Sequence, residues 1–334
     1  MLKYALSRLI WLPIVAWAVA TLTFLVLRLV PGSPIDLVAM QMLDTSQLAR
    51  TSAEWGLDQP LWRQYMVFIT NLLQGDLGIS LSSGVPLTRL LFEKLPPTIE
   101  LTLFAMVISS IIGVGAGIIS SVTRSKPLDY SVRLFAVLGL SIPWFWIAIM
   151  LIVLFSVRLG WMPVGGRIGA GIPYDTITNF MLIDQLITGN WPALWSAIKH
   201  LTLPAVAIGL TSAGFVARLT RSAMLEVLRA DYIRTARAKG LLEQSVTINH
   251  ALRNAILPVI TLQGLQFGAL LGGAVITEIV FAWPGVGRLL LDAILRRDYP
   301  VVQGTVIFVA IAYVFMNLVV DLLYHVVDPR LRQS

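Results

Sequence analysis

The three histidines are the side chains best suited to acid–base or metal chemistry, and they fall in unrelated parts of the chain. None of His200, His250 and His325 has a second histidine at the short helical spacing of a metal-binding motif. The chain has no cysteine, which excludes a thiolate metal site, a disulfide framework and a cysteine nucleophile. No serine lies in a nucleophile-elbow pattern. The sequence therefore predicts no catalytic residue and no metal site.

Nucleotide and ion chemistry also lack an evident site. The glycine-rich stretch around Gly113 and Gly117 lacks the Gly-Lys-Ser/Thr ending of a phosphate-binding loop and lies in an apolar run. Glu278 and Asp321 stand near the ends of apolar runs, where a charge costs less than at mid-membrane. Coupling carboxylates of a secondary transporter and the filter of an ion channel are not evident. We therefore predict no cofactor, and a transport path whose energy comes from something other than this chain.

Composition places the chain in a membrane. It has 334 residues, of which 57% are hydrophobic and 13% charged, whereas soluble domains carry about 25% charged residues. Six apolar runs each approach the ~20 residues that a helix needs to cross a bilayer. Because backbone polar groups must be satisfied inside the membrane, we predict an all-α membrane protein with six transmembrane helices. The runs are 9–27, 101–122, 134–157, 201–217, 255–277 and 301–320.

Lysine and arginine set the expected orientation. With the N-terminus inside, more than half of the 25 basic residues fall in short cytoplasmic segments, as the positive-inside rule requires. Both termini are then cytoplasmic, and residues 28–98 form a large external segment. Orientation in the membrane explains the net charge of +7. We therefore expect the lipid bilayer as a partner, and no nucleic acid.

Two features inside the runs are candidates for packing or for a transport path. Pro143 falls in the middle of the third run, where it removes a backbone hydrogen bond and is expected to kink the helix. Trp144 follows it, and its ring would line a path or face lipid and neighbouring helices. Gly264, Gly268 and Gly272 recur every fourth residue, which permits close approach of another backbone. Tight internal packing and a moving subunit interface both fit this pattern.

One long basic segment, 218–254, interrupts the apolar pattern between the fourth and fifth runs. Asp231 is expected to cap a helix that continues to Lys239, and Gly240 suits the left-handed position after a helix. Thr235, Ala236 and Ala238 have little side-chain bulk, so a partner could approach closely. The positive-inside rule alone also explains the charge. The pattern therefore indicates a docking element, with a solvated basic loop as the alternative.

The stretch YIRTARAKGLLEQSVTINHALRNAILP resembles the cytoplasmic loop of permease subunits of ATP-binding-cassette importers, in the dipeptide and oligopeptide branch. The likeness extends over nearly the whole chain, through the Pro31-Gly32 region, GLDQPLWRQY, GDLGIS, LPPTIELTL, SIPWFW, GWMPVGGR, EIVFAWPGVG and DPRLR. Gly240 matches the glycine of the general motif Glu-Ala-Ala-x3-Gly-x9-Ile-x-Leu-Pro. Arg234-Thr235-Ala236 replaces Glu-Ala-Ala, and Leu252 is the one match in the final Ile-x-Leu-Pro, departures typical of the peptide branch.

The resemblance implies a type-1 permease fold and a set of partners. These are a second permease subunit, expected to be a homologous heterodimer partner, two ATPase subunits and an external substrate-binding protein. It also implies that residues 231–240 form the coupling helix, which enters a cleft in an ATPase subunit. The residues of this helix are Asp231, Tyr232, Ile233, Arg234, Thr235, Ala236, Arg237, Ala238, Lys239 and Gly240.

The resemblance therefore predicts a subunit of the bacterial inner membrane that imports di- or oligopeptides. Nickel, glutathione or sugar oligomers are the alternatives within the branch, and a membrane-embedded enzyme is the alternative from another class. The expected divisions are 1–97 for the first helix and external segment, 98–325 for the permease core with loop 218–254, and 326–334 for a cytoplasmic tail.

Overall fold

The computed structural model describes residues 2–29, 56, 58–123 and 125–327. Regular structure in these residues is helical, apart from one isolated β-bridge between Ile79 and Pro86. The helices and their bounds are α1 (Leu2–Leu29), α4 (Leu61–Leu73), α5 (Leu87–Val122), α6 (Lys126–Ser141), α7 (Trp144–Leu151), the π-helix η1 (Ile152–Arg158), α8 (Met181–Thr188), α9 (Trp191–Val227), α10 (Asp231–Ala238), α11 (Glu243–Ser245), the π-helix η2 (Val246–Leu252), α12 (Arg253–Ala255), α13 (Leu257–Gly273), α14 (Val275–Val280), α15 (Val286–Leu295) and α16 (Tyr299–Val327).

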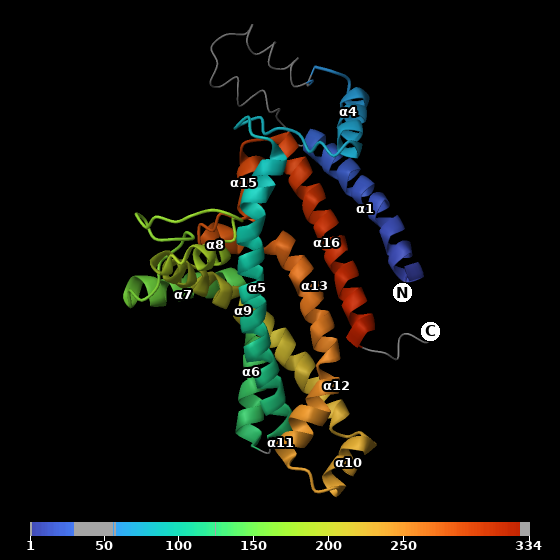
Figure 1. The fold of residues 1–334 in the computed structure, drawn as a ribbon, viewed down its shortest axis with the longest axis vertical. Helices are drawn as coiled ribbons and strands as arrows, with labels where there is room; N and C mark the ends of the chain where they lie inside the picture. Colours follow the sequence, from blue (N-terminus) through green and yellow to red (C-terminus); the bar gives the residue numbers. More distant parts are fainter. Residues whose placement is uncertain (1, 30–55, 57, 124, 328–334) are drawn as a thin grey trace.

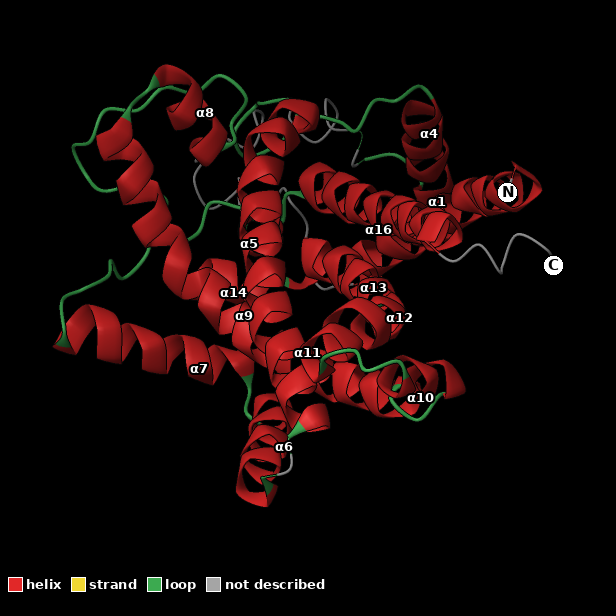
Figure 2. Cartoon of the chain, turned by 60° about the horizontal axis from the view of Figure 1, so that its bottom comes forward, coloured by secondary structure: helices red, strands yellow, loops and turns green. Residues whose placement is uncertain are grey.

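The pair α5 and α9 is the centre of the fold. These two helices pack against each other more extensively than any other pair in the described part of the chain. Leu101 and Ala105 of α5 meet Leu201 and Ile208 of α9 in a buried cluster that also holds Trp283. On one side of this pair, α16 lies between α13 and α1 (Figure 1). On another side, α6 and α7 project away from the centre (Figure 2).

Glycine allows α5 and α9 to come this close. A Cβ atom on Gly113 would lie 2.6 Å from the Cβ of Val216, and one on Gly117 would lie 2.5 Å from the Cβ of Thr220. Neither distance is possible between real side chains, so only glycine fits at these two positions. Small residues at helix–helix contacts are the usual device for close packing in membranes.

Three helices of the described chain are long and apolar enough to cross a membrane, namely α5, α9 and the Tyr299–Val319 part of α16. The bent pair Lys126–Gly139 and Trp144–Arg158 makes a fourth if it is one span. Shorter apolar helices occupy Pro13–Leu29 and Leu257–Leu270. All six predicted runs thus fall on helices, and the count of six crossings stays a prediction.

The third run is broken more strongly than predicted. We expected one helix kinked at Pro143, but α6 ends at Ser141, and α7 starts at Trp144 at 102° to α6. Ile142 and Pro143 between them are extended, with ψ angles of 126° and 128°. Proline disfavours the helical conformation of the residue before it and cannot donate a backbone hydrogen bond, so the helix stops instead of bending.

The helix that contains the fourth run is longer than the run itself. The apolar stretch 201–217 is the middle of α9, whose 37 residues begin with Trp191. Asn190 precedes this helix, and its side chain accepts a hydrogen bond from the backbone N–H of Ala193 at 3.2 Å. The cap and Pro192 in the first turn start the helix well before the apolar residues begin.

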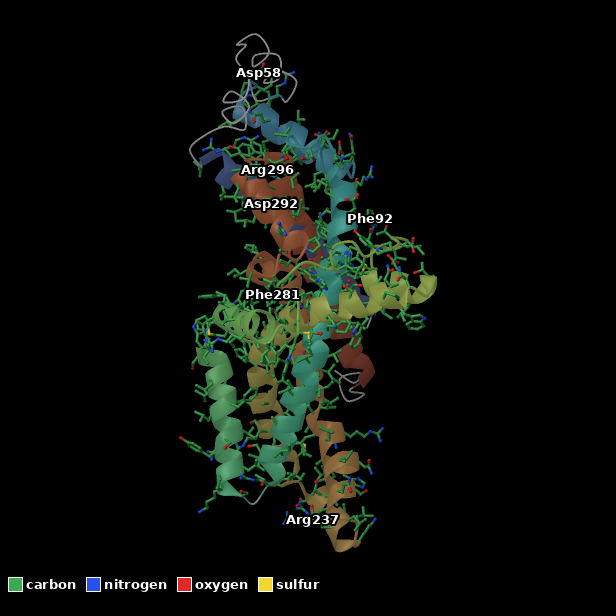
Figure 3. All side chains as sticks on the ribbon, turned by 90° about the vertical axis from the view of Figure 1, so that its left-hand side faces the viewer. Asp58, Phe92, Arg237, Phe281, Asp292 and Arg296 are labelled. Carbon is green, nitrogen blue, oxygen red and sulfur yellow. The ribbon has the colours of Figure 1, made fainter. Side chains whose placement is uncertain are left out.

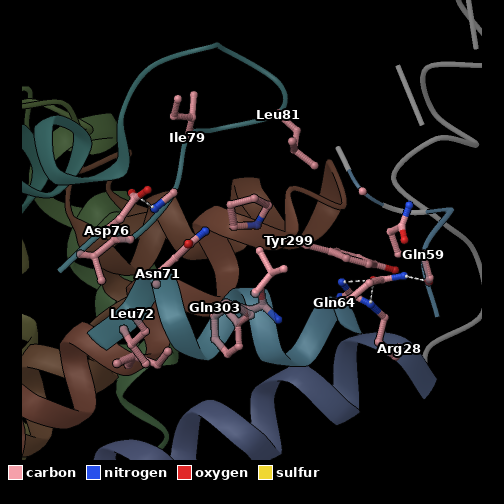
Figure 4. A pocket seen from close by; sticks show the side chains of 18 of the residues that line it. Arg28, Gln59, Gln64, Asn71, Leu72, Asp76, Ile79, Leu81, Tyr299 and Gln303 are labelled. Carbon is pink, nitrogen blue, oxygen red and sulfur yellow. Dashed lines mark hydrogen bonds between the residues drawn. The ribbon is translucent and has the colours of Figure 1, made fainter. Parts of the chain in front are cut away.

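The helix α4, which lies within the predicted external segment, packs on α1. Phe24 of α1 stacks on Phe68 of α4, and Arg28 donates a hydrogen bond of 2.8 Å from Nη2 to Oε1 of Gln64. The guanidinium of Arg28 also lies 4.8 Å from the ring centroid of Tyr299 in α16. Arg28, Gln64, Phe68 and Tyr299 border a cavity of about 590 Å³ between α4, α16 and the loop that follows α4 (Figure 4).

Residues 30–55 of the predicted external segment, with Pro31 and Gly32, lie outside the described residues. Residues 328–334, which make up most of the predicted tail 326–334, also lie outside them.

A glycine-to-alanine pair on α5 tests the central contact. We expect Gly113→Ala to lower the stability of the importer by about 1–3 kcal/mol, because the added methyl group overpacks the interface with α9. Gly115→Ala is the matched control, since no atom lies within 4 Å of the position of its Cβ. Thermal unfolding of the purified complex in detergent measures the difference. Equal melting temperatures for the two variants would contradict the proposed role of Gly113.

Candidate functional site

The predicted helix of the basic loop is α10, and its first turn differs from the prediction. Asp231 is the first helical residue rather than the cap, and Ala230 precedes it in an extended conformation with ψ 150°. The Asp231 side chain pairs with Arg234, and no side-chain cap is formed. An acidic residue in the first turn still interacts favourably with the helix dipole.

The left-handed residue after α10 is as predicted, although the helix ends one residue earlier than expected, at Ala238. Gly240 has φ +75°, the conformation that favours glycine. Its N–H donates to the carbonyl oxygen of Arg237 at 2.9 Å. No atom lies within 4 Å of the position of a Cβ on Gly240, so a larger residue there would be limited by backbone strain and not by space.

One face of α10 is buried against its own chain. Ile233 is completely buried, and Ala236 is 7% exposed. Both join a cluster with Met224 at the end of α9 and Val246 and Ala251 of η2. Burial of an isoleucine contributes about 1.5–3 kcal/mol, whereas an exposed ion pair contributes about 0–1 kcal/mol. The apolar face therefore fixes the position of α10.

This burial corrects one part of the prediction. We expected Ala236 to leave room for a partner, together with Thr235 and Ala238. Ala236 instead faces the loop core, because it lies three residues after Ile233 on the same side of the helix. Thr235 and Ala238 are exposed, as that prediction requires.

The opposite face of α10 is polar and exposed. Tyr232 is 45% exposed, and the Arg234 side chain is 74% exposed. Thr235, Ala238 and Lys239 complete this surface. We call these five residues the outer face of α10. Lys239 has no carboxylate within 4 Å in the described part of the chain, so the face ends in an uncompensated positive charge.

Two side-chain contacts tie α10 to the returning chain. Arg237 donates a hydrogen bond of 2.6 Å from Nε to Oε1 of Glu243, and Asn254 donates one of 2.8 Å to the Tyr232 hydroxyl. Neither contact is predicted by the sequence. The partners are separated by 6 and 22 residues and lie on different helices, so the periodicity of a single element does not indicate them.

The helix α10 lies at one extreme of the molecule, between two long helices. Figure 3 shows Arg237 at that end, with Asp292 of α15 and Arg296, the residue after α15, in the opposite half. The helix α9 is 37 residues long, or about 55 Å at 1.5 Å per residue, and only residues 228–230 separate it from α10. On the other side, η2 and α12 lead directly into α13. A displacement of α10 would therefore act on both α9 and α13.

The other predicted site residues lie on different elements. Trp144 borders a cavity of about 160 Å³ with Ile208 of α9, Leu270 of α13 and Thr277 of α14. Pro143 beside it is exposed. The structure therefore places Trp144 at the meeting point of four helices.

Of the three glycines singled out on α13, Gly268 faces α16. A Cβ atom on Gly268 would lie 2.9 Å from Cδ2 of Tyr313 in α16, so Gly268 packs inside the chain against a side chain. Gly264 is half-buried, and the surroundings of Gly272 lie outside the description.

Residues 113–333 match the family described as "Binding-protein-dependent transport system inner membrane component". Residues 1–102 match the N-terminal region described for the membrane component of the same kind of system. The chain belongs to this family. It is a multi-pass permease subunit of an ATP-binding-cassette importer in the inner membrane, and ATP hydrolysis belongs to separate subunits.

Relatives match the permease along its entire length. It is 43% identical over 332 residues to the dipeptide transport system permease protein DppB of Alkalihalophilus pseudofirmus, covering 99% of this chain and 100% of the relative. It is 44% identical over 335 residues to the di/tripeptide transport system permease protein DppB of Pseudomonas aeruginosa, covering 100% of both chains. It is 39% identical over 332 residues to the glutathione transport system permease protein GsiC of Escherichia coli, covering 99% of both.

The fold of the permease has a counterpart among solved structures. A chain of the MetNI methionine ABC transporter in an inward-facing conformation matches with a TM-score of 0.55 at 18% identity. The match covers 72% of the permease and 96% of the MetNI chain. At this identity the likeness shows the fold alone.

Tryptophan at two neighbouring positions of α10 separates its buried face from its exposed face. We expect Ala236→Trp to unfold the loop locally, because a large ring cannot enter the cluster around Ile233 and overpacking costs about 1–3 kcal/mol or more. Ala238→Trp is the matched control, since its side chain points away from that cluster. Limited proteolysis of the purified permease, separated from its ATPase subunits, should cleave only the first variant faster, between Arg229 and Lys239. Equal cleavage of the two variants would contradict the assignment of faces.

Proposed function

We propose that this permease is the pore-forming subunit of an ATP-driven importer of di- and oligopeptides. The observation that carries the proposal is the outer face of α10, an exposed helix surface connected through short segments to α9 and α13. The substrate class is supported by full-length relatives named for dipeptide and di/tripeptide transport. Glutathione uptake is the second candidate, because a relative of that name matches at 39% identity. Nickel and sugar oligomers remain alternatives.

The coupling helix comprises residues 231–240. Its outer face enters a cleft of an ATPase subunit, and closure of the ATPases pushes on α10. The buried residues Ile233 and Ala236 pass this displacement to Met224 at the end of α9, while η2 and α12 pass it to α13. Because α9 packs along α5, the displacement reaches the centre of the fold and opens the path to the other side of the membrane.

The assembly contains four further subunits. A second, homologous permease completes the pore, two ATPase subunits supply the force, and an external binding protein delivers the substrate. Both termini and loop 218–254 of this permease are cytoplasmic, and segment 28–98 is external. The core 98–325 carries the coupling loop, region 1–97 forms the first helix and the external segment, and the tail is 326–334.

Two substitutions on α10 test the coupling role. Ala238→Trp should block docking sterically, and Gly240→Val should strain the left-handed backbone that ends the helix. We expect both variants to insert normally and to lose at least about tenfold in uptake of a labelled dipeptide. The amount of ATPase subunit that co-purifies with the permease should fall in parallel.

Leu242→Ala is the control for this experiment, because Leu242 is exposed on the same loop but outside α10. Normal uptake and normal ATPase recovery in both α10 variants would refute the coupling role. A wild-type importer that takes up glutathione or nickel but no dipeptide would instead refute the substrate assignment, and would leave the coupling role intact.

Single cysteines test the topology. The chain has no cysteine, so an introduced thiol is the only site for a maleimide. Ser83 precedes α5 and Gln244 lies in the α11 turn, and both residues are exposed. In intact cells without their outer membrane barrier, we expect an impermeant maleimide to label Ser83→Cys and to spare Gln244→Cys until the membrane is opened. Labelling of both cysteines from the same side would overturn the proposed orientation.

A further inference from the structure

A groove lies between α6 and α9 at the end of the molecule that carries α10. It has a volume of about 370 Å³ and is lined only by residues of these two helices in the described chain. In Figures 1 and 2, α6 lies at the same end as α10 and α11 and has one side open. The residues that determine the character of the groove are Arg133, Ala136 and Val137 of α6 and Arg218, Arg221 and Leu225 of α9.

Close packing of the two helices closes the inner end of the groove. A Cβ atom on Gly214 would lie 2.9 Å from the carbonyl oxygen of Ala136, so α6 and α9 touch at this level. Two helical turns nearer the α10 end, the helices are joined only by long side chains. There, Nε of Arg221 lies 3.1 Å from Oδ1 of Asp129. The groove fills the space between these two contacts.

The groove carries an excess of positive charge. Asp129 neutralises part of it, because its carboxylate also lies 2.9 Å from Nη2 of Arg133 and accepts a hydrogen bond from Ser120. Arg218 has no carboxylate within 4 Å in the described residues, and its guanidinium lies 5.8 Å from the ring centroid of Phe215. Three guanidinium groups therefore face one carboxylate, which leaves a net charge of +2 for an anion to neutralise.

Apolar surface lies beside the arginines of the groove. Ala136 and Val137 of α6 line it near the contact with α9. Val137 is 55% exposed, and Phe215 of α9, whose ring lies beside Arg218, is 45% exposed. A free phosphate ion would use only the arginines, and an acidic protein segment would not need the apolar strip at membrane depth. A phospholipid uses both parts.

We propose that this groove binds an anionic phospholipid, such as phosphatidylglycerol, from the leaflet on the α10 side. Its phosphate accepts hydrogen bonds from Arg218 and Arg133, and an acyl chain lies over Val137 toward Phe215. Basic pockets between transmembrane helices are a known mode of anionic headgroup recognition. A bound lipid would join α6 to α9 just before α9 leads into α10. The inference is independent of the transported substrate.

Lipid titration of the complete importer tests the proposal. Binding of phosphatidylglycerol to the purified complex is measured by native mass spectrometry, with phosphatidylcholine as the zwitterionic comparison. We expect Arg133→Gln/Arg218→Gln to weaken phosphatidylglycerol binding at one site by roughly 30-fold, since each guanidinium near the surface attracts an anionic lipid with about 1 kcal/mol. Arg288→Gln/Arg296→Gln, on and directly after α15, removes the same charge in the opposite half of the molecule (Figure 3) and should change nothing. Equal affinities for all three proteins would overturn the proposal.

Two further measurements separate the lipid from other occupants. Inorganic phosphate at the same concentration should not displace phosphatidylglycerol, and displacement would show a site for small anions instead. A fluorophore on Val137→Cys should be quenched by brominated phosphatidylglycerol in nanodiscs, whereas one on Leu242→Cys in the loop should not. Absence of quenching at Val137 would mean that another subunit covers the groove, and would also overturn the proposal.

Discussion

Gly113 and Gly117 allow α5 to approach α9 more closely than any residue with a side chain would permit. The arrangement of the other helices depends on that contact. A methyl group at either position would lie within 2.6 Å of a neighbouring Cβ atom. In a bilayer there is little hydrophobic drive for helices to associate, so close packing of this kind provides much of the attraction. It makes α9, the longest helix of the described chain, part of a rigid pair and not a free rod.

In the proposed coupling role, the rigid pair of α5 and α9 receives the displacement of α10. Its apolar face is held by Ile233 and Ala236 in the same cluster that contains Met224 of α9. The cluster leaves the opposite face exposed and polar. In the proposed coupling role, force on that face is passed on through the buried cluster, because α9 precedes α10 on one side and η2 and α12 follow it on the other. Under that proposal, docking and transmission are separate tasks of two faces of one short helix.

Positive charge gathers at the α10 end. The predicted orientation counts the arginines of α6 and α9 as cytoplasmic, and the structure gathers Arg133, Arg218 and Arg221 around one groove. Asp129 compensates for part of this charge and links α6 to α9. Charges that look interchangeable in the sequence therefore differ in the structure: Arg221 joins helices, whereas Arg218 remains available to an anion.

Several features of this protein could be predicted from the sequence alone, because they depend on local chemistry. The length of the apolar runs predicted helices in a membrane, the family resemblance in 231–258 predicted the permease loop, and the steric freedom of glycine predicted the left-handed Gly240. Each of these features depends on neighbours in the chain. Contacts between distant residues decided the rest. Whether Ala236 faced a partner or the loop core depended on Met224 and Val246, and the break at Pro143 became a turn of 102° because α7 packs across α9. Side-chain volume and the helical period do not determine which neighbour a helix face contacts. Only the tertiary structure therefore distinguished the buried Ala236 from the exposed Ala238.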